Sequence, residues 1–505
     1  MKQKKSKRKG MIYYLNHKNL IVEIEQYGHV LSFKELLVSY LKVVFAGIVA
    51  AYLFKLPLYG YIIIIGASML FVSSLIISSY KSLYEQRKFS DANLYLEKML
   101  YFFKKSQKIY LSLNEALKMF PFGNVHNLIQ NTIVVIRTSE GENIKEEALK
   151  LIEEEFPNNR IKTLHSFMLN VESKGGDPSL GVDMLLEDRE LWKNRVVSLQ
   201  QDKQIIKKNV IIALILTLGL CLSILYLPFM IGNLGNMDIS GNIFVQWSAI
   251  FLIVFLFFFY TKVNKQLCTC WLEYDIIQDE SNIEKRYNDF INVDIQKEKL
   301  KSMIYAFITV IGTAIIFLSF NLKIILFFGF ASSLFFLNSY KIGYKIEKKN
   351  ITKEISKFFP TWLLNIALLM QYENVHMAIA LSYEDAPAIL KPAIKQLLEE
   401  IDDNPASPTP FNRFLSDFSL SEVKESMNTL YSISEASGGN IDDEFRQIIT
   451  RVNKYMDKAE QIKNNDKLAI MSSYISAPAF IGSIKLAIDM VVMLMTFISM
   501  SNSIV

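Results

Sequence analysis

The chain has 505 residues, of which 51% are hydrophobic, and its 55 basic and 50 acidic residues leave a formal charge of +5. None of the 20 glycines is followed by lysine, so the sequence excludes a Walker phosphate loop. The five histidines show no metal-ligand spacing, and no GxSxG elbow occurs. We therefore predict no catalytic residue, no cofactor site and no metal site, and we do not expect an enzyme.

Segment 1–35 is predicted to be a basic cytoplasmic tail. It opens with a basic run over Met1–Lys9 and has no apolar run directly behind it, so it is not a cleavable signal peptide. Basic residues beside a span stay in the cytoplasm, and each gains about 1 kcal/mol from anionic lipid. Nucleic acid is not a predicted partner, because no basic patch interleaved with aromatic residues accompanies the tail.

Seven stretches approach or exceed about 20 apolar residues, the length of helix that crosses a bilayer core. This clustering predicts a multi-pass membrane protein that contacts membrane lipids, and we expect it in the cytoplasmic membrane. The last stretch is predicted to be one span, because it falls short of the roughly 40 residues that two spans need. The predicted spans are Leu36–Phe54, Leu58–Ser79, Val210–Gly232, Ile243–Val263, Met303–Phe320, Ile324–Tyr340 and Ile470–Met500.

Counting spans from a cytoplasmic N-terminus divides the chain into membrane and cytoplasmic segments. Lysine and arginine favour the segments that this count places inside, which supports the orientation. The predicted segments are the tail 1–35, a transmembrane hairpin 36–80, a cytoplasmic helical domain 81–208, a hairpin 209–263, a connector 264–302, a hairpin 303–340, a second cytoplasmic helical domain 341–469 and a C-terminal transmembrane helix 470–505.

The two cytoplasmic domains have helical periodicity, as in Leu96, Met99 and Phe103, and little strand-like alternation. The predicted fold class is therefore an all-α polytopic membrane protein. Polar residues at matching places, Ser112 in the first domain and Asn374 in the second, are predicted to cap short helices.

A glycine pair occurs in each cytoplasmic domain in the same setting. Gly175-Gly176 follows Glu172, and Gly438-Gly439 follows Glu435 at an offset of about 263 residues. In both copies a charged helix and then an apolar stretch follow. The recurrence predicts two tandem modules, each with a cytoplasmic helical bundle between transmembrane helices.

Two interpretations of the glycine pairs are compatible with the sequence. In the first they end a helix, because glycine adopts positive φ without steric cost. In the second they form a turn that presents Lys174 or Asn440 to a partner.

Charged residues in the last apolar stretch raise a separate question. Lys485 and Asp489 lie four residues apart and therefore on one helix face. A charge at the bilayer centre costs about 2.5–3.5 kcal/mol on insertion scales, so one hypothesis is a functional intramembrane pair. The alternative is that Lys485 marks an interfacial turn.

Other polar clusters have simpler interpretations. The acidic residues within 146–155 and 399–403 are spread around helices, which favours solvated faces over a metal or acid–base site. A basic partner that docks on these negative faces is the functional alternative. Cys221, Cys268 and Cys270 are predicted to be unpaired thiols of a reducing compartment.

The paired Glu-x-x-Gly-Gly turns, each followed by a basic helix and a span, resemble the type II secretion system F family. These are the membrane platform proteins of type II secretion systems, type IV pili, tight-adherence (Flp) pili and archaeal pili or archaella. Two spans before each cytoplasmic domain are similar to the tight-adherence and archaeal branches, as if two F-type modules were joined in one chain.

The resemblance implies a machine that couples a cytoplasmic hexameric assembly ATPase to pilin extraction, filament assembly or protein secretion. Its implied partners are that ATPase, pilin or pseudopilin subunits and further copies of the chain as a homo-oligomer. Two other classes stay open, a membrane transporter and a membrane-anchored signalling scaffold.

Overall fold

The structure is a computed structural model that describes residues 17–29, 32–141, 143–230, 238–268, 271–272, 280–320, 323–435 and 441–504. All regular elements in these ranges are helices, and the ranges contain no strand. The predicted all-α class is therefore confirmed. Most of the basic tail, Gly438, Gly439 and Cys270 lie outside the described residues.

Six helices of the described chain are long and apolar enough to cross a membrane, as a multi-pass protein requires. They overlap six of the seven predicted spans. The C-terminal region holds one such candidate, Gln447–Met500. The remaining predicted span, Ile324–Tyr340, lies in α12 (Lys323–Leu369), and several side chains near the start of that helix lie outside the described residues.

The chain forms two compact units, and each gathers segments that are far apart in the sequence. Unit 1 takes in 1–94, 193–274 and 464–505, and unit 2 takes in 95–192 and 275–463. The predicted boundaries after residues 80, 208 and 469 fall inside continuous helices, because no glycine or proline interrupts the backbone there. The organisation into two tandem modules stays a prediction.

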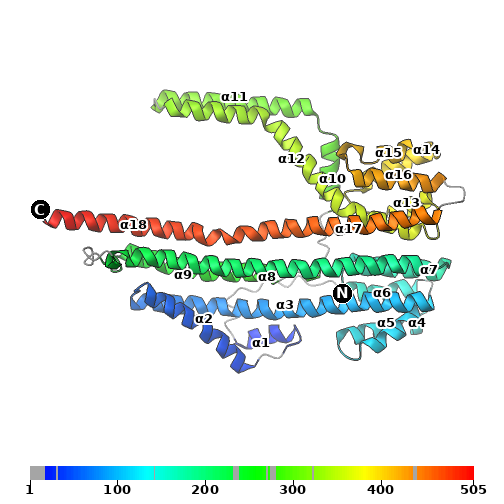
Figure 1. Cartoon of the computed structure of the whole chain (residues 1–505), viewed down its shortest axis with the longest axis horizontal. Coiled ribbons are helices and arrows are strands. Elements are labelled where there is room, and N and C mark those ends of the chain that lie inside the picture. The colour runs from blue at the N-terminus through cyan, green and yellow to red at the C-terminus, as the bar shows by residue number, and fades with distance from the viewer. Residues whose placement is uncertain are drawn as a thin grey trace. The chain divides into compact units, whose positions relative to one another are not determined.

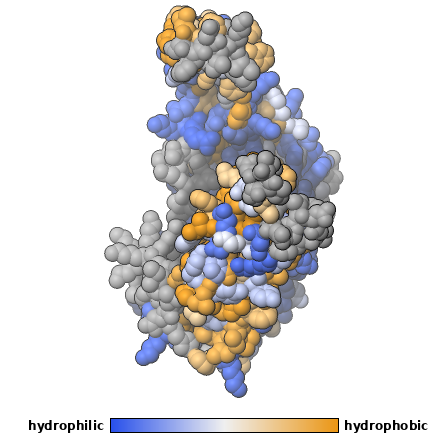
Figure 2. Space-filling model, turned by 90° about the vertical axis from the view of Figure 1, so that its left-hand side faces the viewer, coloured by the Kyte–Doolittle hydropathy of each residue, from blue (hydrophilic) through white to orange (hydrophobic). Residues whose placement is uncertain are grey.

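Unit 1 is built from apolar helices. Its elements are α1 (His17–Glu25), α2 (Phe33–Leu53), the first part of α3 (Leu58–Ser106), the later part of α8 (Ser179–Met230), α9 (Ile243–Leu267), the end of α17 (Ile441–Ser472), the short helix η3 (Ser473–Ile475) and α18 (Ala477–Ile504). Many apolar side chains on these helices are exposed, such as Phe45 and Leu216, as expected of surfaces that face lipid. Figure 2 shows such apolar surface beside polar residues.

The core of unit 1 lies where α3, α8, α9 and α18 meet. Ile64, Cys221, Leu252 and Val492 are buried in one cluster. A Cβ added at Gly482 of α18 would lie 2.5 Å from a methyl carbon of Thr217 on α8, so this glycine permits close approach of the two helices. An asparagine, Asn242, caps α9 by accepting a hydrogen bond from the Phe244 N–H over 2.9 Å.

Unit 2 combines amphipathic helices with the apolar helix α11 and the apolar start of α12. Its elements are the end of α3, α4 (Ile109–Met119), α5 (Asn124–Thr138), α6 (Ile144–Glu155), α7 (Asn159–Lys174), the start of α8, α10 (Glu280–Ile291), α11 (Ile295–Phe320), α12, α13 (Val375–Ser382), α14 (Lys391–Asp403), α15 (Thr409–Arg413), the short helix η2 (Ser416–Phe418), α16 (Ser421–Glu435) and most of α17. The helices are labelled in Figure 1.

The buried faces of unit 2 follow the predicted periodicity. Leu96, Met99 and Phe103 of α3 are all buried. Asn374 caps α13 as predicted, accepting a hydrogen bond from the Met377 N–H over 2.8 Å. The predicted cap at Ser112 is wrong, because α4 already begins at Ile109 and the Ser112 hydroxyl bonds back to the Lys108 carbonyl over 2.8 Å.

Candidate functional site

The first glycine pair ends α7 and turns the chain into α8. Gly175 has φ 82° and Gly176 has φ 108°, values that side chains rarely tolerate. The Gly175 N–H donates to the Val171 carbonyl over 2.9 Å and so closes the last turn of α7. A Cβ added at either glycine would meet nothing within 4 Å. The turn therefore requires glycine for its backbone conformation and not for space.

The residues after the pair begin the next helix. The Asp177 carboxylate accepts hydrogen bonds from the Ser179 N–H over 3.0 Å and the Ser179 hydroxyl over 2.7 Å. These bonds hold the pKa of Asp177 below its usual value. An acidic residue at this place also complements the positive end of α8.

Lys174, the residue before the glycine pair, contacts residues from the second half of the sequence. Its ammonium forms an ion pair with Glu373, after α12, and lies 5.1 Å from the ring centre of Tyr372. Burial raises the pKa of the Tyr372 hydroxyl to about 12, although a hydrogen bond with Asn170 acts against this shift. In the described chain Lys174 thus links two parts of unit 2.

A third glycine, missed by the sequence reasoning, lies at the same place. A Cβ at Gly181 on α8 would approach the Gln371 side-chain nitrogen to 2.4 Å and the Phe167 ring to 2.5 Å. The backbone of α8 therefore passes close to both side chains. We call Asn170, Lys174 and Gly181 with Gln371, Tyr372 and Glu373 the turn contact. The short separation of Gly176 and Gly181 was the only signal for it in the sequence.

A buried ion cluster lies along the same helix pair. The Arg160 guanidinium donates to both oxygens of Asp188, over 2.8 and 3.1 Å, and to Glu460 of α17 over 3.2 Å. Its carbon also lies 5.3 Å from the ring centre of Trp192, which is fully buried. Asp188 is 2% exposed and Glu460 is 4% exposed, so these charges are taken out of water and held by each other.

The segment that is predicted to be the second copy contains the helix pair α16 and α17. Lys458 forms an ion pair with Glu422, and the Tyr455 hydroxyl donates to Glu425 over 3.1 Å. Burial acts to raise the pKa of Glu422, but the hydrogen bond and charge of Lys458 leave it below its usual value. The second glycine pair lies between these helices, outside the described residues.

A buried histidine joins three helices of the first bundle. The Tyr95 hydroxyl lies 2.9 Å from His165 Nε2, and His165 Nδ1 lies 2.8 Å from Glu153 Oε1. Burial lowers the pKa of His165, while Glu153 acts in the opposite direction. Glu153 was assigned to a solvated acidic face by the sequence reasoning, which cannot pair residues on α3, α6 and α7. By contrast, Glu146 pairs with Lys150 at the surface.

The two predicted intramembrane charges do meet. Lys485 forms an ion pair with Asp489, and the side chains of both are almost fully buried in unit 1. Both lie inside the continuous helix α18, so Lys485 does not mark a turn. The Lys485 ammonium lies 6.0 Å from the ring centre of Phe54. The second oxygen of Asp489 has no hydrogen-bond partner among the described residues.

The described residues contain no group of three or more acidic, histidine or cysteine side chains arranged to hold a metal ion. Cys221 and Cys268 are free thiols. Comparison of the chain with family models, with curated proteins and with solved structures found no match in any of the three.

Proposed function

We propose that the protein is the membrane platform of a type IV pilus or type II secretion-like machine of the tight-adherence or archaeal type. In this role it couples a cytoplasmic assembly ATPase to the extraction of pilin subunits, and it performs no catalysis itself. The proposal is supported by the six candidate spans, the helical bundles, the glycine turn after α7 and the recurrence of a glycine pair in the sequence.

The observation that carries the proposal is that α3 and α8 each combine an apolar part with a part that is buried in a helical bundle. α3 has its apolar window in its first part and buried bundle residues such as Tyr95 and Phe103 in its last part. α8 begins at the glycine turn, carries Asp188 and Trp192, and ends in an apolar stretch. A hydrogen-bonded helix is stiff along its axis, so a displacement of the bundle is passed to the apolar end of the same helix.

The proposed partners are the hexameric assembly ATPase, pilin or pseudopilin subunits, and further copies of this chain. The turn contact and the buried ion cluster give the bundle the rigidity that force transmission needs. The localisation that we propose is the cytoplasmic membrane with the N-terminus in the cytoplasm.

Co-purification from the native host tests the proposal. We expect the tagged, detergent-solubilised protein to retain a hexameric ATPase. The Gly175→Val variant, whose turn cannot form without strain, should abolish filaments or secretion, and Gly438→Val should do the same. Gly343→Val is the matched control, because Gly343 lies in helix α12 with open space around it. Normal filaments and secretion in both turn variants would contradict the proposal.

A transporter remains the second candidate, because the buried pair of Lys485 and Asp489 is of the kind that lines ion pathways. Flux of a solute into vesicles that contain only this protein would favour it. In that case the Asp489→Asn variant should lose the flux, while Gly175→Val should keep it.

A further inference from the structure

A cavity of about 480 Å³ lies between the first two apolar helices of unit 1. Glu35, Ser39 and Lys42 line it from one face of α2, and Leu75, Ser79 and Tyr80 line it from one face of α3. The two helices are joined at a tight turn and diverge towards the start of α2 (Figure 1). The volume is within the roughly 300–1,000 Å³ that is usual for small-molecule sites.

The other side of this gap is already filled by the protein itself. Leu20 and Ile24 of α1 are buried against Val72 and Ile76 of α3. Val72 and Ile76 also line the cavity, so this packing gives the cavity an apolar floor.

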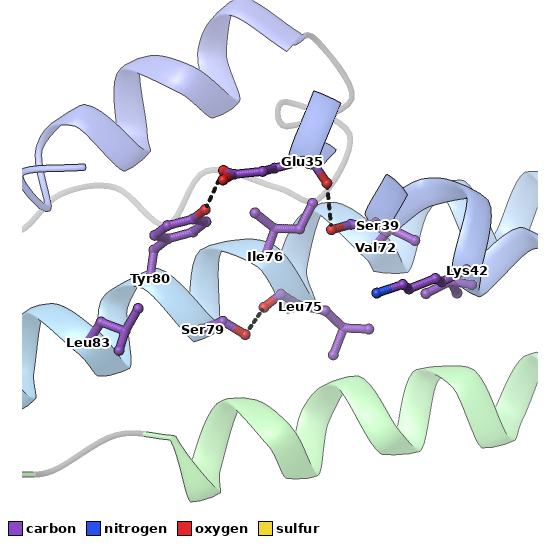
Figure 3. A pocket seen from close by; sticks show the side chains of 10 residues that line it. Glu35, Ser39, Lys42, Val72, Leu75, Ile76, Ser79, Tyr80 and Leu83 are labelled. Carbon is purple, nitrogen blue, oxygen red and sulfur yellow. Dashed lines mark hydrogen bonds between the residues drawn. The ribbon is translucent and has the colours of Figure 1, made fainter. Parts of the chain in front are cut away.

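The polar groups of the cavity are arranged in order along α2. Glu35 lies near the start of the helix, where its carboxylate is 3.4 Å from the Tyr80 hydroxyl. Lys42 lies seven residues further on, about 10 Å deeper into the apolar part at 1.5 Å per residue. Figure 3 shows the Lys42 side chain extending into the cavity and the Glu35 carboxylate directed at Tyr80. Lys42 has no ion-pair partner among the described residues.

We propose that this cavity binds phosphatidylethanolamine, with the headgroup ammonium at Glu35 and the phosphate at Lys42. The order of charges matches this lipid, whose ammonium lies further from the acyl chains than its phosphate. Ser39 and Ser79 also line the cavity, and their hydroxyls donate to the Glu35 and Leu75 carbonyls of their own helices. The apolar floor around Leu75 takes the start of an acyl chain. This inference is independent of the platform role.

Native mass spectrometry of the full-length protein tests the site. The delipidated protein is mixed with equal amounts of phosphatidylethanolamine, phosphatidylglycerol and phosphatidylcholine, and the retained lipids are counted. We expect phosphatidylethanolamine to be retained over both competitors by about tenfold, the effect of one charge-assisted hydrogen bond. Equal retention of phosphatidylglycerol would overturn the assignment of the ammonium to Glu35.

Three variants locate the binding. Lys42→Gln should lower phosphatidylethanolamine retention about tenfold, and Glu35→Gln should remove the preference over phosphatidylglycerol. Ser79→Trp fills the cavity while keeping both charges, so it should also displace the lipid. Lys34→Gln, which removes an exposed charge from the same helix outside the cavity, should retain lipid as the wild type does. The proposal is wrong if Lys34→Gln and Lys42→Gln lose lipid equally, or if Ser79→Trp retains it.

Discussion

The helix pairs α7–α8 and α16–α17 occupy corresponding places in the two halves of the sequence, but they are held together differently. In the first pair the contact is a guanidinium that donates to both oxygens of a buried carboxylate, with side chains 15% and 3% exposed. In the second the ion pair is Lys458 with Glu422, with side chains 56% and 18% exposed, and hydrogen bonds from Arg451 to Thr429 and from Tyr455 to Glu425 also join the helices.

This difference has a physical consequence. A planar guanidinium fixes both the distance and the orientation of its carboxylate, whereas an ammonium on a flexible stem fixes little. Ion pairs at the surface contribute roughly 0–1 kcal/mol, whereas breaking a buried pair is far more costly. We therefore expect the ion pair between α7 and α8 to stabilise its helices more than the ion pair between α16 and α17 does.

The largest effect is expected from the buried cluster. Asp188→Ala removes the carboxylate that accepts two hydrogen bonds from the mostly buried Arg160 guanidinium, and should lower the free energy of unfolding by about 3 kcal/mol. Glu422→Ala in the second pair should cost at most about 1 kcal/mol. Urea unfolding in detergent compares the two variants. Equal losses would remove the distinction between the pairs.

A smaller effect is expected at the close approach in the turn contact. Gly181→Ala places a methyl group against Phe167 and Gln371, and should cost about 1–3 kcal/mol as an overpacked site. Gly343→Ala adds the same methyl group to an open helical position and should be neutral or slightly stabilising. Urea unfolding in detergent also compares these two variants. A Gly181→Ala variant as stable as Gly343→Ala would show that the helices separate without cost.

Next in size is the backbone effect at the turn. Gly175→Ala requires a side chain at φ 82° and should cost about 1–2 kcal/mol, although no atom is in its way. Gly438→Ala gives the corresponding value for the second copy. If the modules are repeats, the two losses should agree within measurement error. A loss of stability in Gly175→Ala without one in Gly438→Ala would contradict the prediction that the two modules are repeats.

The smallest effect on stability is expected from acidification, because Glu153 partly offsets the lowering of the His165 pKa that burial causes. Since the pKa of His165 is lowered in the folded state, the unfolded chain takes up the proton first, and stability falls as the pH drops below about 6.5. The pKa of Glu422 is also lowered, so its contribution is present above about 4.3 and is lost only at lower pH.

Amide hydrogen exchange, corrected for intrinsic exchange rates, distinguishes the α7–α8 pair from the α16–α17 pair. On acidification from neutral pH, α7 should lose protection before α16, and the His165→Gln variant should remove that early loss. Simultaneous loss in both helices would contradict the assignment of the first step to His165.

Local patterns along the chain predicted much of the fold. Apolar length predicted six spans that the structure bears out, three- and four-residue periodicity predicted the buried face with Leu96 and Phe103, and a polar residue before a helix predicted the cap at Asn374. Ser112 failed because the helix starts one turn earlier, at Ile109, where no side-chain cap marks its start.

The site was less accessible to sequence reasoning because its contacts join distant segments. Lys485 and Asp489 are four residues apart on one helix, so their pairing was visible. Arg160 and Glu460 are 300 residues apart, and no local pattern relates them. The same holds for Gly181 and Gln371, whose proximity depends on how the end of α12 packs against α8.

The most direct test of the platform role is a deletion of the gene in the native host, followed by counts of surface filaments and an assay of secreted protein. The account predicts that filaments or secretion are lost, that wild-type protein restores them, and that Gly343→Ala restores them while Gly175→Val does not. Undiminished filaments and secretion in the deletion strain would contradict it.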